Sequence, residues 1–169
     1  MLKQTRNAVH RRQVLGKEGF PLRLDPILTG IAGQHYVAAE LCRRGWVATI
    51  TLRNTRGIDV LASRPDVKRV VGIQVKTGQD KGRQWPLNAK AEKLASPTLF
   101  YVFVKLNGPK GNPTFHVVPS KVVARRIRQG HRRWLAQKGR DGRAHRDTPM
   151  RLFLDREDRF LDMWRLLDS

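Results

Sequence analysis

The sequence predicts one α/β domain built on a mixed β-sheet, and three observations favour this fold class. A segment with helical capping signals comes first, and a series of segments with strand patterns follows it. One later run, 99–106, is almost wholly apolar, as is typical of a central strand buried on both faces. The 169 residues fit a single domain, which we place at 24–169, after a basic N-terminal tail at 1–23.

The first predicted element is a helix over 26–44. Asp25 is a favourable N-cap, Pro26 suits the first helical position, and Gly45 can end the helix. On a helical wheel one apolar stripe contains Ile27, Ile31, Ala38, Leu41 and Cys42. Gln34 lies in the middle of this stripe, so we expect it to point into the fold and to require a polar partner there. That partner is either a functional site or simply a neighbouring strand.

Five segments with alternating or continuous apolar residues predict strands. They are 46–52, 57–62, 69–77, 99–106 and 114–118. The first three are separated by linkers short enough for hairpins, and 78–90 is predicted to be a polar loop that leads into a short helix near 89–94.

Two helices are predicted in the C-terminal part. Ser120 can cap a helix over 121–137, and Asp155 can cap a final helix that ends at Leu167. A short strand near Leu152 is expected between them.

Three polar residues fall on neighbouring strands. Gln74 and Lys76 are two positions apart and therefore share one face of their strand. Asp59 lies in the preceding strand, and a hairpin would let it face both of them. Taken alone, this pattern fits a structural Asp59–Lys76 ion pair as well as an active site, because a half-buried lysine needs an anionic partner.

The order of these motifs closely resembles the PD-(D/E)XK nuclease superfamily, especially its resolvase-like and restriction-endonuclease-like branches. A helix ending in Arg-Arg-Gly is followed by a strand, then by Gly-Ile-Asp-Val at 57–60 and Ile-Gln-Val-Lys-Thr at 73–77. The resemblance covers about residues 30 to 106 and implies a restriction-endonuclease-like three-layer fold, a mixed central β-sheet flanked by helices. It also implies a metal-dependent endonuclease that hydrolyses DNA phosphodiester bonds.

The superfamily's site residues can be carried over position by position. Asp59 matches the second-strand aspartate, Lys76 the lysine, Gln74 stands at the third-strand acid, and Gln34 at the helix acid. The resemblance implies that Mg²⁺ or Mn²⁺ binds Asp59, Gln74 and the backbone carbonyl of Val75. Because two expected carboxylates are amides, an alternative is a catalytically inactive nuclease-fold DNA-binding module.

The charge of the chain points to nucleic acid as its partner, with an anionic membrane surface or an acidic protein as the alternatives, and the resemblance implies that the nucleic acid is DNA. Lys and Arg number 34 against 14 Asp and Glu, a net charge of +20, and so basic a chain attracts polyanions. The helix near 121–138 is richest in cations, and we expect it to bind phosphates through Arg125, Arg126, Arg128, Arg132, Arg133 and Lys138. The alternatives are a solvated helix face and, for the whole chain, a basic structural or interaction protein.

Other features limit the remaining function classes. A single cysteine, Cys42, permits no internal disulfide and fits a reducing cytoplasm. The five histidines have no zinc-binding spacing, and no stretch of 18 apolar residues suggests a membrane span. Many nucleases of the resembled superfamily dimerise to cut two strands, so a homodimer is possible.

Overall fold

The computed structural model describes residues 23–52, 57–79 and 82–169, so that residues 1–22 of the predicted basic tail lie outside the described residues. A five-stranded sheet has the order β1-β2-β3-β5-β6, in which β3 and β5 are parallel and the other neighbours are antiparallel. Its strands are β1 (Val47–Ile50), β2 (Val60–Ser63), β3 (Val70–Gly78), β5 (Leu99–Lys105) and β6 (Thr114–Pro119). The predicted mixed sheet is confirmed.

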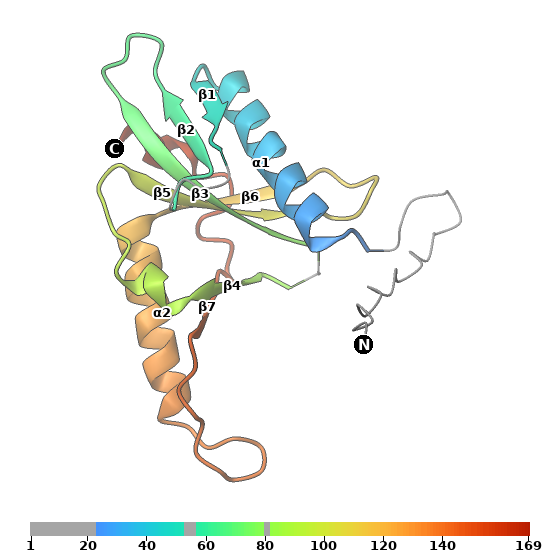
Figure 1. Ribbon diagram of the computed structural model, residues 1–169, viewed down its shortest axis with the longest axis vertical. Helices are drawn as coiled ribbons and strands as arrows, with labels where there is room; N and C mark the ends of the chain where they lie inside the picture. Colours follow the sequence, from blue (N-terminus) through green and yellow to red (C-terminus); the bar gives the residue numbers. More distant parts are fainter. Residues whose placement is uncertain (1–22, 53–56, 80–81) are drawn as a thin grey trace, which may run out of the picture.

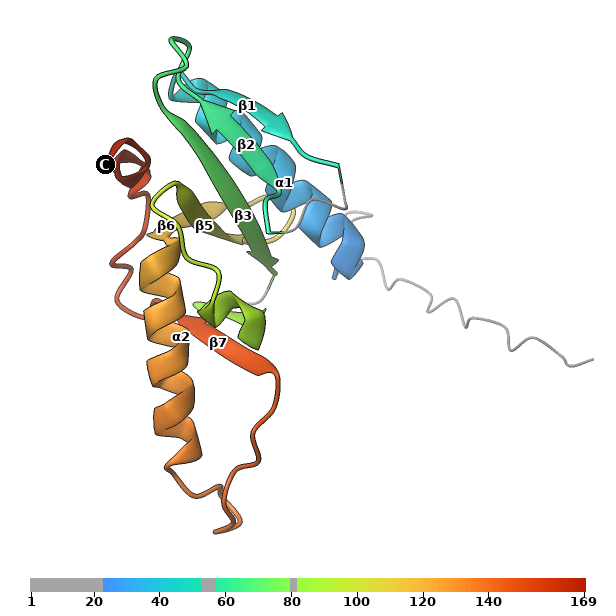
Figure 2. The ribbon, with the colours of Figure 1, turned by 60° about the vertical axis from the view of Figure 1, so that its left-hand side comes forward.

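Helices cover both faces of this sheet, so that the domain has three layers (Figures 1 and 2). Helix α1 (Pro26–Arg43) packs on one face, where Val37 and Leu41 join a core with Ile73 and Val75. Helix α2 (Ser120–Leu135) and a two-stranded sheet of β4 (Gln84–Asn88) and β7 (Met150–Leu154) pack on the other face. Alternate residues of β5 enter the two cores, which explains its continuous apolar sequence.

Helix α1 begins and ends as the sequence predicts, but it buries a different stripe. The Asp25 side chain accepts a hydrogen bond of 2.7 Å from the backbone N–H of Ile27, and Gly45 adopts a φ of +76° after the helix. Ile27 and Ile31 are 59% and 37% exposed, however, and Cys42 is also exposed. The buried stripe is Thr29, Gly33, Val37 and Leu41.

The position of Gly33 explains this difference. A Cβ atom on Gly33 would lie 1.8 Å from Oγ1 of Thr77, so the helix backbone approaches β3 too closely for any side chain there. Close backbone approach selects the face that carries glycine rather than the face with the largest apolar side chains. The predicted stripe is therefore wrong at Ile27, Ile31 and Cys42, which are exposed, whereas Ala38 is half-buried. Only Leu41 belongs to both stripes.

Two predicted helix caps have other roles. The Asp155 side chain is buried and accepts hydrogen bonds from His116 Nδ1 at 2.7 Å and from the Phe160 backbone N–H at 3.0 Å, while residues 156–163 form turns instead of a helix. Ser120 begins α2 without capping it, because its hydroxyl donates to the Ser96 carbonyl at 2.9 Å. Both side chains join distant segments, which local sequence patterns do not reveal.

The C-terminal segment closes the α1 side of the sheet. A short 3₁₀ helix, η2 (Trp164–Asp168), buries Trp164 and Leu167 in the same core as α1. Arg64 binds the Asp168 carboxylate at 2.8 Å, and Arg69 Nε donates to the Leu167 carbonyl at 3.0 Å. The β2–β3 hairpin is thereby tied to residues about a hundred positions later in the chain.

In the part of the chain that the structure describes, no helix has both the length and the apolar character needed to span a membrane.

Candidate active site beside strands β2 and β3

The backbone carries Asp59 to the end of the β2–β3 ladder. The last β2–β3 pair joins Val60 to Ile73, and the Asp59 N–H extends the ladder by donating to the Ile73 carbonyl at 2.8 Å. Gly57 enters this segment with a φ of +75°, and a Cβ atom there would lie 2.8 Å from Leu94 Cδ2. Glycine at position 57 therefore permits the turn that positions Asp59.

The structure joins Asp59 to Gln74. Oδ2 of Asp59 accepts hydrogen bonds from Gln74 Nε2 at 2.6 Å and from the Val75 backbone N–H at 2.7 Å. A carboxylate can only accept, so the glutamine presents its amide N–H₂ and keeps its carbonyl oxygen for another partner. The Gln74 amide thus holds the Asp59 side chain in place without the repulsion that a second carboxylate would cause.

Lys76 lies two positions beyond Gln74 on the same face of β3 and is half-buried. It forms no ion pair with any carboxylate in 23–52, 57–79 or 82–169, Asp59 included. The structural Asp59–Lys76 ion pair, the alternative interpretation of this pattern, is therefore not formed. Lys76 shares a face of β3 with Gln74, the residue that binds Asp59, and the ion pairs of the described residues do not include its charge.

The oxygen atoms at this point suit a hard divalent cation. The N–H and C=O groups of a strand residue point to the same side, so the Val75 carbonyl faces the strand edge at which its N–H meets Asp59. One carboxylate, one amide oxygen and one backbone carbonyl are ligands that Mg²⁺ and Mn²⁺ accept together with water and phosphate oxygens. Among the described residues no cluster of three or more His, Cys, Asp and Glu side chains could hold a metal, so a metal site here would depend on Gln74 and Val75.

Tyr101 forms the buried wall beside these residues. It is opposite Gln74 in the parallel β3–β5 pair and only 1% exposed. Burial and, to a lesser extent, the negative charge of Asp59 raise the pKa of Tyr101 to about 12. The phenol is consequently neutral at physiological pH and gives the site a wall without charge.

The structure does not join Gln34 to this group. Gln34 is half-buried on α1, and none of the described hydrogen bonds links it to Asp59, Gln74 or Lys76. Helix α1 packs on the face of β3 that carries Ile73 and Val75, whereas Gln74 and Lys76 belong to the other face. A role for Gln34 in the site stays a prediction.

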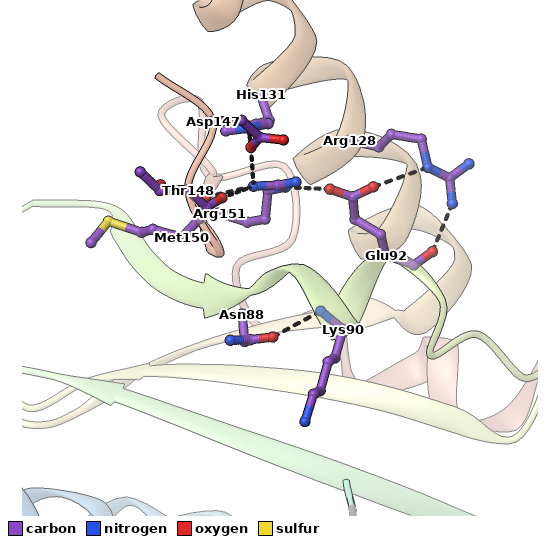
Figure 3. Close-up of polar contacts among 9 residues, drawn as sticks. All are labelled: Asn88, Lys90, Glu92, Arg128, His131, Asp147, Thr148, Met150 and Arg151. Atoms are coloured by element: carbon purple, nitrogen blue, oxygen red, sulfur yellow. Dashed lines mark hydrogen bonds and ion pairs between the residues drawn. The ribbon is translucent and has the colours of Figure 1, made fainter. Parts of the chain in front are cut away.

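The predicted phosphate-binding cations of α2 are in different environments. Arg128 is bound to Glu92, donating to its backbone carbonyl at 2.7 Å and pairing with its carboxylate at 3.4 Å (Figure 3). Arg126 and Arg133 line a pocket described below. Arg125, Arg132 and Lys138 are exposed.

Glu92 joins three elements of this side of the molecule. Its carboxylate binds Arg128 of α2 and Arg151 of β7, and Arg151 lies 3.6 Å from Asp147, which also accepts from His131 at 2.7 Å (Figure 3). Burial acts to raise the pKa of Glu92, but the hydrogen bonds and charges of Arg151 and Arg128 together lower it from the usual 4.5.

We therefore expect Glu92 to contribute stability that is lost in acid. A lowered folded-state pKa means that the contribution is present above the unfolded-state pKa and disappears as the pH falls through the folded-state value. Denaturant unfolding of wild type and Glu92→Gln between pH 7 and pH 3 measures it. Wild type should be the more stable at pH 7, and the difference should shrink towards pH 3; a difference independent of pH would contradict this assignment.

Sequence reasoning missed the buried His116–Asp155 pair and the Glu92 cluster. The signal for the first was an aspartate placed directly after the apolar run Leu152-Phe153-Leu154, which we interpreted as a helix cap. The Glu92 cluster carries no local signal, because its members come from η1 (Ala89–Glu92), α2, β7 and the segment before β7.

Comparison with known proteins bears on the fold. No protein-family model matches the chain, and a search of curated proteins finds no match. Among solved structures, the chain is similar to a bacterial homing endonuclease, I-Ssp6803I, with 15% identity and a TM-score of 0.50 over 86% of this chain and 94% of that one. It is also similar to Hjc, a Holliday junction resolvase from Archaeoglobus fulgidus, with 12% identity and a TM-score of 0.44 over 75% of this chain and 84% of that one.

A sequence identity of 15% supports a similarity of fold and no statement about activity. The mixed sheet with helices on both faces and the similarity to I-Ssp6803I agree with the resemblance noted in the sequence. The chain has the restriction-endonuclease-like fold of PD-(D/E)XK nucleases.

Proposed function

We propose that this protein is a metal-dependent endonuclease that hydrolyses DNA phosphodiester bonds. The observation that carries the proposal is the hydrogen bonding of Asp59 by Gln74 and Val75 at the end of β2 and β3. Lys76, on the same face of β3 as Gln74, has no carboxylate partner among the described residues. The net charge of +20 supports a polyanionic substrate. The solved structures with which the chain shares its fold include one of a homing endonuclease.

Each residue of this group has a distinct task. Asp59 supplies the negative charge, and its two hydrogen bonds fix the carboxylate before any ligand arrives. The Gln74 and Val75 oxygens complete the donor set for Mg²⁺ or Mn²⁺. When bound, such a cation lowers the pKa of water and offsets charge that develops on the phosphate.

Lys76 acts on the substrate phosphate. Its ammonium group has no carboxylate partner among the described residues, so it can approach a phosphate oxygen without first breaking an ion pair. On the same face of β3 as Gln74, it would stabilise the charge that grows on the phosphate oxygens during hydrolysis. Because Tyr101 is neutral, the charge of the site is set by Asp59, Lys76 and the cation.

A second candidate is a DNA-binding module with this fold that does not cleave. The observation in its favour is that Gln74 is an amide whose N–H₂ group occupies one oxygen of Asp59, the one carboxylate of the group. Nicking of supercoiled plasmid with Mg²⁺, Mn²⁺ or EDTA separates the two functions. Relaxed plasmid that appears only with a divalent cation supports the nuclease, and intact plasmid under all conditions favours the binding module.

Both candidates predict strong, salt-sensitive DNA binding. Each phosphate that Lys or Arg neutralises releases condensed counterions, so the logarithm of the affinity should fall linearly with the logarithm of the salt concentration. Fluorescence anisotropy with a labelled duplex in EDTA measures this slope without cleavage. Affinity that does not change with salt, or no binding at low salt, would exclude both functions and leave a basic interaction protein.

A further inference from the structure

A second charged surface lies between α2 and the segment that follows β7. It is an open pocket of about 790 Å³ whose lining includes four arginines, Arg126, Arg133, Arg156 and Arg159. Strand β7 ends next to helix α2 (Figures 1 and 2), and the pocket lies between that helix and residues 154–159. No residue of the Asp59 group lines it, so it is separate from the candidate active site.

The pocket has an excess of positive charge. Its two acids are Asp155 and Glu157. The Asp155 carboxylate is buried and satisfied by His116 and by the backbone N–H groups of Arg159 and Phe160. Glu157 pairs with Arg159 at 2.6 Å.

The remaining arginines lack a close carboxylate. Arg126 lies 3.9 Å from the satisfied Asp155 and 4.7 Å from the ring centre of Phe160. Arg133 and Arg156 have no side-chain ion pair with any residue that the structure describes. Arg133 Nε donates only a long hydrogen bond of 3.4 Å to the Gln129 carbonyl. Two guanidinium groups in the lining of one pocket thus have no carboxylate partner among the described residues.

Gly130 leaves this space open between two of the arginines. It lies between Arg126 and Arg133 on one face of α2, in the wall of the pocket. Glycine inside a helix costs about 1 kcal/mol relative to alanine. The fold does not require it here, because a Cβ atom on Gly130 would meet nothing within 4 Å. Because residue 130 has no side chain, this part of the pocket wall stays open to a molecule that binds from solvent.

We propose that this pocket binds a backbone phosphate of the nucleic acid, away from the bond that is cut. Guanidinium groups bind phosphate oxygens through paired N–H donors, which suits Arg133 and Arg156. The inference rests on the proposed function, since the DNA duplex is the polyanion that the basic chain would engage. Binding here holds the substrate in position and leaves the chemistry to Asp59 and Lys76.

The test compares affinity for a labelled duplex oligonucleotide, in EDTA, between variants matched in charge. Arg133→Gln/Arg156→Gln removes the two unpaired guanidinium groups of the pocket. Arg140→Gln/Arg146→Gln removes the same charge from exposed positions outside the pocket. Gly130→Leu adds an apolar side chain to the pocket wall between Arg126 and Arg133 without changing charge. Leucine is the better helix former, so this variant should remain folded, as thermal unfolding will show.

We expect the pocket pair to weaken binding by about tenfold or more and to lower the salt slope by about 1, since one phosphate contact is lost. The comparison pair should lose clearly less, and Gly130→Leu should weaken binding like the pocket pair. Equal losses in both arginine pairs together with wild-type affinity in Gly130→Leu would overturn the pocket and indicate a diffuse basic surface. A wild-type protein that binds no DNA would overturn the proposed function and this inference together.

Discussion

Replacing Asp59 or Lys76 with alanine should reduce DNA cleavage by about 100-fold or more, while most of the DNA affinity remains. Loss of Asp59 removes the one charged oxygen donor of the proposed metal site and leaves the Gln74 amide without its partner. Loss of Lys76 removes the cation that offsets charge on the phosphate, and such electrostatic contributions are worth about 100- to 1000-fold in rate. Lysines and arginines elsewhere in the chain supply the affinity for DNA, because Lys and Arg together number 34.

The β2–β3 hairpin that carries Asp59 and Lys76 also offers matched controls. Asp66 and Lys68 lie in the turn at its other end, exposed and 3.8 Å apart. Asp66→Ala and Lys68→Ala should therefore nick plasmid at the wild-type rate. Single-turnover nicking with Mn²⁺ measures all four variants beside wild type. If Asp59→Ala and Lys76→Ala cleave as fast as these controls, the activity belongs to another site or to a contaminating nuclease.

Replacing Gln74 with glutamate should make the stability of the folded protein depend more strongly on divalent metal than it does in wild type. The substitution turns a hydrogen bond of 2.6 Å to Asp59 into a contact between two acceptors that repel each other. Hydrogen bonds to charged groups contribute about 2 kcal/mol, so in EDTA the variant should be less stable than wild type by about that amount. A divalent cation would be held by two carboxylates instead of one, and ligand binding to the folded state restores stability.

Thermal unfolding in EDTA and in Mn²⁺ measures both effects. The rise in melting temperature on adding Mn²⁺ should be larger for Gln74→Glu than for wild type. In Gln74→Glu/Asp59→Ala, which again has one carboxylate, the rise should be no larger than in wild type. Gln84→Glu adds the same charge at an exposed position of β4 and serves as the control. If Mn²⁺ stabilises Gln74→Glu no more than it stabilises Gln84→Glu, then Gln74 does not lie at a metal site.

The parts of this fold that the sequence predicts are those governed by local rules. Asp25 and Gly45 mark the ends of α1 through capping and positive φ, and both interactions depend on neighbours in the chain. The period of two in β3 places Gln74 and Lys76 on one face, and the short β2–β3 linker fixes the hairpin that brings Asp59 to Gln74.

Features that depend on distant segments could not be predicted in this way. Strand β4 lies in a stretch that we expected to be a loop, because its partner β7 is more than sixty residues away and its sequence includes Pro86. The buried face of α1 depends on Thr77 of β3, which admits only glycine at position 33. The position of Asp155 in the sequence is typical of a helix cap, but its carboxylate is hydrogen-bonded to the buried imidazole of His116.

The contacts of η2 have a consequence for how the chain folds. Trp164 and Leu167 complete the core that α1 and the first strands begin. Arg64 binds Asp168 and Arg69 binds Leu167, across sequence separations of 104 and 98. Contacts between such distant positions form only after large loops have closed, and proteins that depend on them fold slowly. Until then, the apolar surface between α1 and β6 is exposed to other chains, so refolding yield should fall as protein concentration rises.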